Sequence, residues 1–104
     1  MDNLVDIEIW EKIKDFPTYE VSNKGNVRKI EFRNNGVPGK NLIHRSRTKN
    51  ARPHVHLYEH RIPYITYLDR AVSEAFLPRG KVGQRLVHID GDIKNNNVNN
   101  LTYK

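Results

Sequence analysis

The chain has 104 residues, which is enough for one domain with a modest hydrophobic core. It contains no cysteine, which excludes disulfides and thiolate metal sites and fits a reducing environment. The 18 Lys and Arg residues exceed the 12 Asp and Glu residues, and this positive charge favours binding to polyanions, nucleic acid first among them. No apolar run is long enough to span a membrane and the N-terminus does not resemble a signal peptide, so we expect a cytoplasmic protein without a membrane partner.

The N-terminal third predicts a helical turn followed by a β-hairpin. Apolar residues in EIWEKIKDFP, residues 8–17, recur at spacings of three and four, which favours an amphipathic turn that ends before Pro17. In YEVSNKGNVRKIEF, residues 19–32, strand-forming residues lie on both sides of a polar turn in which Gly25 can supply a positive φ. We therefore expect a β-hairpin over this stretch.

The middle of the chain is basic and rich in turn formers. Residues 33–53 have little periodicity, which indicates either a long functional loop or two poor strands joined by a loop. Basic side chains in such a loop can contact phosphates, although a merely solvated loop is an equally weighted alternative. The five candidate nucleic-acid-binding residues are Lys40, Arg45, Arg47, Lys49 and Arg52.

The remainder predicts a second hairpin, a helix and two more strands, so the fold class is α+β. Alternation in HVHLYEHRIPYITYL, residues 54–68, predicts the hairpin, and LDRAVSEAF, residues 68–76, has the spacing of a short amphipathic helix. Strands are expected at 86–89 and 101–103, separated by an asparagine-rich loop with room for one helical turn. The predicted core residues of this part are Leu68, Val72, Phe76, Leu86, Ile89, Val98 and Leu101.

Three side chains have both a functional and a structural interpretation. His54 and His56 share one face of a predicted strand at a spacing that can bind a metal, but no Cys or Asp lies nearby, so we expect solvent-facing positions. Trp10 could stack on a base, yet a single tryptophan in a short apolar element is more often part of the core.

Two motifs in the same order resemble the HNH homing endonucleases of bacteriophages and mobile introns. LDRAVSEAFLP and VHIDGDIKNNNVNNL are similar to the helix and the signature of that family. IWEKIKDFPTYEVSNKGNVRKI resembles the nuclease-associated module that often precedes them. The resemblance implies a nuclease-associated module over 1–35 and a truncated HNH-like region over 36–104, in one compact unit. Its last part would be a ββ unit of the ββα-metal type without the C-terminal helix.

The resemblance also implies the roles of two residues. His88 occupies the place of the general base, which takes a proton from the attacking water, and Asn100 that of the asparagine that orients it. The family has an Asp or Asn metal ligand just before the histidine, where this chain has Val87, and the second ligand position falls beyond Lys104. We therefore expect both catalytic positions to be vestigial and no metal cofactor to be bound.

Two carboxylates beside His88 have an alternative role. Asp90 and Asp92 could bind Mg²⁺ or Mn²⁺, but Asp-Gly-Asp is also a sequence that tight turns favour, and the turn is the preferred interpretation. A divalent ion is expected only if the chain is an active enzyme.

Three functions follow from these observations. The chain could be an active metal-dependent HNH DNA endonuclease, a nuclease-dead DNA-binding module, or a small phage protein that binds and inhibits a host or defence protein. In the last case a partner or a second copy would cover apolar surface on the C-terminal hairpin. We expect a catalytically degenerate relative that acts by binding in a bacterial cytoplasm, with the active endonuclease as the alternative.

Overall fold

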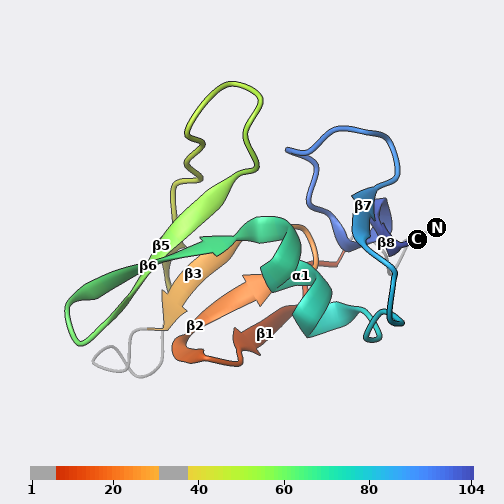
Figure 1. The fold of residues 1–104 in the computed structure, drawn as a ribbon. Helices are drawn as coiled ribbons and strands as arrows, with labels where there is room; N and C mark the ends of the chain where they lie inside the picture. The colour runs from red at the N-terminus through yellow and green to blue at the C-terminus, as the bar shows by residue number, and fades with distance from the viewer. Residues whose placement is uncertain (1–6, 31–37) are drawn as a thin grey trace.

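The computed structural model describes residues 7–30 and 38–104, which form a small α+β fold with three antiparallel sheets and one α-helix in this part of the chain (Figure 1). No described helix is long and apolar enough to cross a membrane. The first sheet has the strand order β1-β2-β3-β4, and the other two are the hairpins β5–β6 and β7–β8. The elements are β1 (Trp10–Ile13), β2 (Phe16–Ser22), β3 (Val27–Ile30), β4 (Pro38–Asn41), β5 (His54–Glu59), β6 (Ile62–Tyr67), α1 (Leu68–Phe76), β7 (Leu86–His88), a 3-10 turn η3 (Val98–Asn100) and β8 (Leu101–Tyr103).

The predicted N-terminal helical turn is wrong, because residues 10–13 form strand β1. Its pairing with β2 changes register between Lys12 and Ile13, as in a β-bulge. A bulge interrupts the two-residue alternation of a strand, so the buried Ile13 follows Trp10 at a spacing that imitates a helix. The ring of Trp10 is only half-buried, and the Arg28 guanidinium lies 3.7 Å from its centre.

The first predicted hairpin is confirmed as β2 and β3, with Gly25 at φ +87° in the connecting turn. Strand β4 then pairs with β3, so the first sheet includes strands on both sides of residue 35. The predicted module boundary therefore does not coincide with an edge of this sheet. After β4 the basic segment 42–53 runs as a loop, tied to β5 by the backbone bridge between Arg45 and His54.

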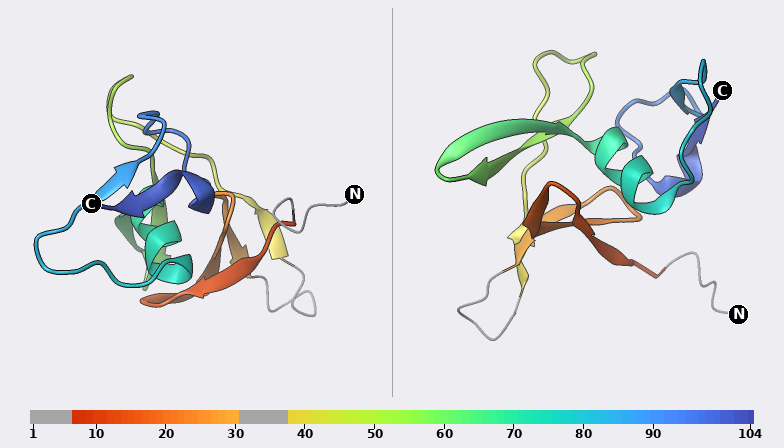
Figure 2. Two further views of the ribbon diagram at one scale, coloured as in Figure 1. Left: turned by 90° about the vertical axis from the view of Figure 1, so that its right-hand side faces the viewer. Right: turned by 60° about the horizontal axis from the view of Figure 1, so that its bottom comes forward.

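The second hairpin and the helix are confirmed. The turn of β5–β6 consists of His60 and Arg61, both with positive φ, as in a type I′ hairpin turn. The prediction for His54 is wrong: its side chain is 7% exposed, because the 42–53 loop and Tyr67 cover it. Helix α1 contacts the face of β1–β2 on one side and the η3 turn on the other (Figure 2).

One core connects the three sheets and the helix. Buried residues of β2, β3, β5, α1 and β8 form a single cluster, and the Tyr19 hydroxyl accepts a hydrogen bond from the Tyr58 backbone N–H at 3.1 Å, joining β2 to β5. Of the predicted core residues, Leu68, Val72 and Leu101 are buried, and Phe76, Leu86 and Val98 are partly buried against them. The prediction for Ile89 is wrong: β7 ends at His88, and the Ile89 side chain is 62% exposed at the start of the next turn.

Candidate nucleic-acid interface and the His88 site

The β2–β3 turn is a rigid polar structure. The buried Ser22 hydroxyl accepts hydrogen bonds from the backbone N–H groups of Lys24 and Asn26, and it donates to Glu8 at 2.6 Å. The Asn26 amide also donates to Glu8 at 2.6 Å. Burial acts to raise the pKa of the Glu8 carboxyl, but these hydrogen bonds and nearby Lys24 and Arg28 lower it below its ordinary value. An ionised Glu8 therefore stabilises the turn through its hydrogen bonds with Ser22 and Asn26.

This turn supports the asparagine-rich loop that follows β7. The Asn23 carbonyl accepts a hydrogen bond from the Val98 backbone N–H at 2.8 Å. Gly25 lies so close to the same loop that a Cβ there would be 3.0 Å from the carbonyl oxygen of Asn96. The N-terminal sheet therefore fixes the position of the loop that faces His88.

The side chain that contacts the His88 ring is Asn96. Its amide oxygen lies 2.8 Å from His88 Nε2. This contact fixes the orientation of the His88 ring. The Asn96 side chain is 4% exposed, and its Nδ2 has no hydrogen-bond partner among the residues that the structure describes. In the sequence Asn96 is one of five similar loop asparagines. Its proximity to Gly25, which distinguishes it from the others, is visible only in the structure.

Asn100 is buried next to the other end of this loop. Its amide oxygen accepts from the Asp90 backbone N–H, and its Nδ2 donates to the Asp90 carboxylate and to the Asn95 carbonyl. Its own backbone carbonyl accepts from the Ile89 N–H, one residue past the histidine. The hydrogen bonds of the Asn100 side chain therefore hold the 90–95 turn, and the ring of His88 is held by Asn96.

The turn interpretation of the two carboxylates is confirmed. Asp90 Oδ1 accepts the Asp92 backbone N–H at 2.8 Å, and Asp92 Oδ1 accepts the Lys94 backbone N–H at 3.0 Å, with Gly91 at φ +76° between them. The hydrogen bond from the Asn95 side chain, followed by those from the Asp92 backbone and Asn100, lowers the pKa of the exposed Asp90 carboxyl.

The residues around His88 do not fit a divalent metal ion. Val87 offers no lone pair, and both oxygens of Asp90 already accept hydrogen bonds from its own loop. Within residues 7–30 and 38–104, no three His, Cys, Asp or Glu side chains gather closely enough to ligate an ion.

The five predicted nucleic-acid-binding residues divide into two groups. Arg52 is held in the protein: its Nε and Nη2 donate to Asp69 at 3.0 and 2.7 Å, and its guanidinium lies 4.1 Å from the centre of the Tyr67 ring. The hydrogen bond to Asp69 raises the pKa of Arg52. The side chains of the other four are exposed: Lys40, Arg45, Arg47 and Lys49.

The loop that carries three of these residues is also next to the buried histidine. Burial, together with the charges of His56, Arg47 and Arg45, lowers the pKa of His54, so its imidazole is neutral at neutral pH. The loop therefore rests on an uncharged side chain, and the positive charge lies on its outer surface. Figure 1 shows that this loop and the loop after β7 rise from the same side of the molecule.

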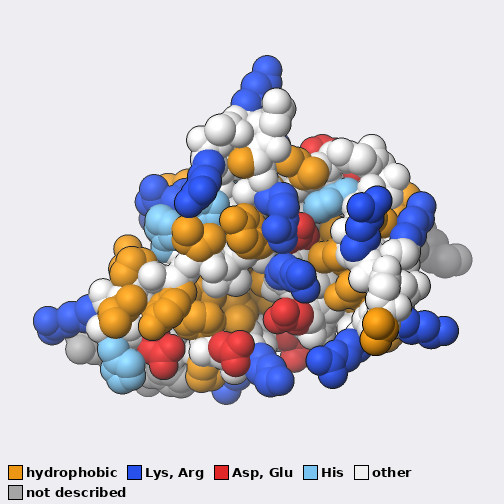
Figure 3. Space-filling view, in the orientation of Figure 1, with side chains coloured by type: hydrophobic (Ala, Val, Ile, Leu, Met, Phe, Trp, Pro, Cys, Tyr) orange, Lys and Arg blue, Asp and Glu red, His pale blue; other side chains and the backbone are white. Residues whose placement is uncertain are grey.

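A hollow of about 430 Å³ lies between α1 and β7, beside His88. Lys and Arg side chains gather over this part of the surface (Figure 3). Sequence reasoning missed two of its residues, Arg70 on the exposed side of α1 and Arg85 just before β7. Their only signal in the sequence is that each lies within a family-like motif or directly beside one.

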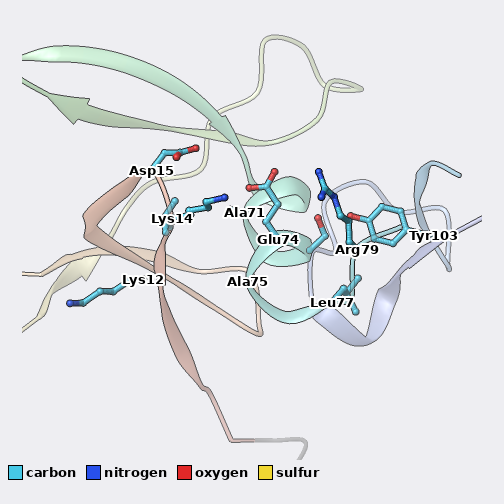
Figure 4. Close-up of a pocket in the computed structure, with 11 residues that line it drawn as sticks. Lys12, Lys14, Asp15, Ala71, Glu74, Ala75, Leu77, Arg79 and Tyr103 are labelled. Carbon is cyan, nitrogen blue, oxygen red and sulfur yellow. The ribbon is translucent and has the colours of Figure 1, made fainter. Parts of the chain in front are cut away.

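A second hollow, of about 480 Å³, lies between the β1–β2 turn and α1. Its charges are mixed: Lys12, Lys14 and Asp15 come from one side, and Glu74 and Arg79 from the other (Figure 4). Charges of both signs do not favour a polyanion, so the hollow beside His88 is the better candidate for nucleic acid.

Comparisons with known proteins found a family motif and a similar structure. Residues 8–58 match the family model of the NUMOD4 motif. The chain is similar to a solved structure described as DNA binding and cleavage by the HNH homing endonuclease I-HmuI, with a TM-score of 0.77 and 28% identity over 92% of this chain. It spans 52% of the length of that chain. No curated protein matches it.

These similarities confirm the resemblance found in the sequence. The chain has an HNH endonuclease fold with a NUMOD4 motif in its N-terminal half, and it is a relative of the HNH homing endonucleases. The matched 8–58 segment includes the Ser22–Asn26 turn and the strands that support it.

Proposed function

We propose that this chain binds DNA through the basic surface around His88 and through the exposed basic loop at 45–49, and that it does not cleave the bound DNA. It would act in the cytoplasm of a bacterial host, encoded by a phage or prophage. The similar endonuclease binds and cleaves DNA, and the chain carries a formal charge of +6. The observation that carries the non-cleaving part is Val87, which stands where that family has its first metal ligand.

The chemistry of phosphodiester cleavage explains why Val87 matters. A water molecule attacks a phosphodiester effectively only if the charge that develops on the leaving oxygen is stabilised, which is the role of the metal in this family. The contact with Asn96 orients the His88 ring. The neighbouring side chains are Val87, which has no lone pair to give, and Asp90, whose oxygens are used by its own turn. A histidine without a metal ion beside it leaves the charge on the leaving oxygen unstabilised, so we expect binding without cleavage.

DNA binding by the exposed basic loop is testable through its salt dependence. The variant R45A/R47A/K49A should flatten the plot of log affinity against log salt by about 0.9 for each phosphate interaction that is removed, up to roughly 2.7 in total. Arg52 is left unchanged, because its pairing with the buried Asp69 supports the fold. Affinity for a DNA duplex is measured by fluorescence anisotropy between low and moderate salt.

A charge-matched control separates this loop from net charge. K12A/K14A/K29A removes three exposed cations on the first sheet and should change the slope much less. If the loop variant keeps the affinity and slope of the wild type while the wild type binds, the loop has no part in binding. If the wild type shows no affinity for duplex DNA even at low salt, the proposed DNA binding is wrong.

A protein-binding role is the second candidate, and one observation favours it. The β5–β6 hairpin exposes Tyr58, Ile62, Tyr64 and Ile65, whose exposed fractions range from 43 to 53%. Apolar side chains grouped on one hairpin are typical of surfaces that contact another protein. A pull-down from bacterial lysate with and without nuclease treatment separates the two: a partner retained after digestion supports a protein target, such as a host or defence enzyme, and one that disappears supports DNA.

A further inference from the structure

The hollow beside His88 carries positive charge for which the family motif gives no role. Three arginines and one histidine line it, namely Arg52, Arg70, Arg85 and His88. Asp69 is the only acidic side chain among its lining residues. The net charge of the hollow therefore depends on whether the Asp69 carboxylate is free to neutralise the arginines.

Asp69 is not free. Its Oδ2 accepts from Arg52 Nε at 3.0 Å, and its Oδ1 accepts from Arg52 Nη2 and from the Arg70 backbone N–H, both at 2.7 Å. The carboxylate is thus paired with Arg52, and the two charges cancel. Neither Arg70 nor Arg85 takes part in an ion pair among the residues that the structure describes. The net charge that faces the hollow is that of two unpaired guanidinium groups.

These two arginines are attached to ordered backbone. Arg70 lies in the first turn of α1, and Arg85 exchanges two backbone hydrogen bonds with Lys104, of 2.8 and 2.9 Å, next to β7. A guanidinium group presents a planar set of donors that matches the oxygens of a phosphate. Two such groups on ordered backbone around one hollow can bind a phosphodiester without a metal ion.

We propose that the hollow lined by Arg70, Arg85 and His88 binds a phosphate of the DNA backbone, and that the two arginines hold this phosphate without a metal ion. This proposal rests on the DNA-binding function proposed above and assigns a particular phosphate site to it. Bound there, one phosphate lies against the His88 ring, and the exposed loop at 45–49 contacts others on the same side of the molecule (Figure 1). The duplex is thereby anchored at the vestigial site and left intact.

The test compares two double variants that each remove two positive charges. R70Q/R85Q alters the hollow beside His88, and K12Q/K14Q alters the mixed hollow on the β1–β2 turn (Figure 4). With a duplex of about 12 base pairs as the probe, R70Q/R85Q should weaken binding at least tenfold at low salt and flatten the log–log salt slope by about 0.9, because the two arginines bind one phosphate. K12Q/K14Q should change the affinity less than threefold.

A local readout accompanies the affinities. The ring proton signals of His88, assigned by their absence in H88A, should shift when the duplex is added to the wild type and should stay unchanged in R70Q/R85Q. All four side chains are exposed, and unfolding curves of both variants check that the fold is kept. If the wild type binds DNA but R70Q/R85Q binds with the same affinity and slope, or the His88 signals do not respond, the phosphate site is overturned and the proposed function stands. If the wild type does not bind the duplex at all, the proposed function itself fails.

Discussion

Replacing Gly25 with alanine should lower the free energy of unfolding by about 2–4 kcal/mol. Two effects add. Gly25 has φ +87°, a conformation that side chains with a Cβ rarely adopt, and the new Cβ would lie 3.0 Å from the Asn96 carbonyl oxygen and 3.1 Å from Asn96 Cβ. The neighbour is backbone that cannot rotate away, so the turn or the loop must move. Urea unfolding of G25A beside the wild type measures the loss.

A matched glycine separates backbone strain from steric overlap. Gly83 has φ +89° but nothing within 4 Å of the position of a Cβ. G83A should therefore show only the conformational cost, roughly 1–2 kcal/mol. Because Asn96 holds the His88 ring, G25A should also shift the ring signals of His88 in NMR spectra, whereas G83A should not. Equal losses of stability in the two variants and unmoved His88 signals would show that the turn does not support the site.

Replacing Leu57 with alanine should lower the free energy of unfolding by about 2–5 kcal/mol. Leu57 is fully buried in β5 and belongs to a cluster that includes Val21 and Val27 of the first sheet. Removing its side chain therefore leaves a cavity next to the N-terminal sheet. Since Trp10 is the sole tryptophan and lies in β1, its fluorescence follows the unfolding of that sheet.

This variant also tests whether the chain is one compact unit. In L57A the transition followed by Trp10 fluorescence and that followed by circular dichroism should shift together, and V21A should move the same single transition. The exposed Ile62 provides the control, because I62A should change stability by less than about 0.5 kcal/mol. A Trp10 transition that stays in place in L57A would mean that the two parts of the chain unfold independently.

Periodicity predicted the elements whose burial pattern is regular. Helix α1 begins and ends where the spacing of Leu68, Val72 and Phe76 places it, and Gly25 has the positive φ expected of the first hairpin turn. Periodicity failed at β1, because the bulge at Ile13 replaced the alternation of a strand with a spacing that resembles a helix. The prediction that Ile89 is buried failed for a related reason. The apolar pattern extends to Ile89, but it does not show that strand pairing ends one residue earlier, at His88.

The candidate site was predictable only as far as local motifs reach. The positions of His88 and Asn100, and the turn at Asp90, follow from residues adjacent in sequence. The roles of Asn96 and Arg52 depend on partners far along the chain, Gly25 and Asp69, that no local pattern connects to them. Arg70 and Arg85 likewise line one hollow only because the fold brings α1 and the start of β7 to its two sides.

The most direct test of binding without cleavage is a nicking assay on supercoiled plasmid with the 104-residue chain. Wild type and H88A are incubated at high protein concentration with Mg²⁺ and separately with Mn²⁺, and binding to the same DNA is measured under the same conditions. We predict that both proteins bind and that neither nicks the plasmid above the protein-free background, because Val87 cannot supply a ligand beside His88. Metal-dependent nicking by the wild type that is abolished in H88A would contradict this prediction and show a working endonuclease site.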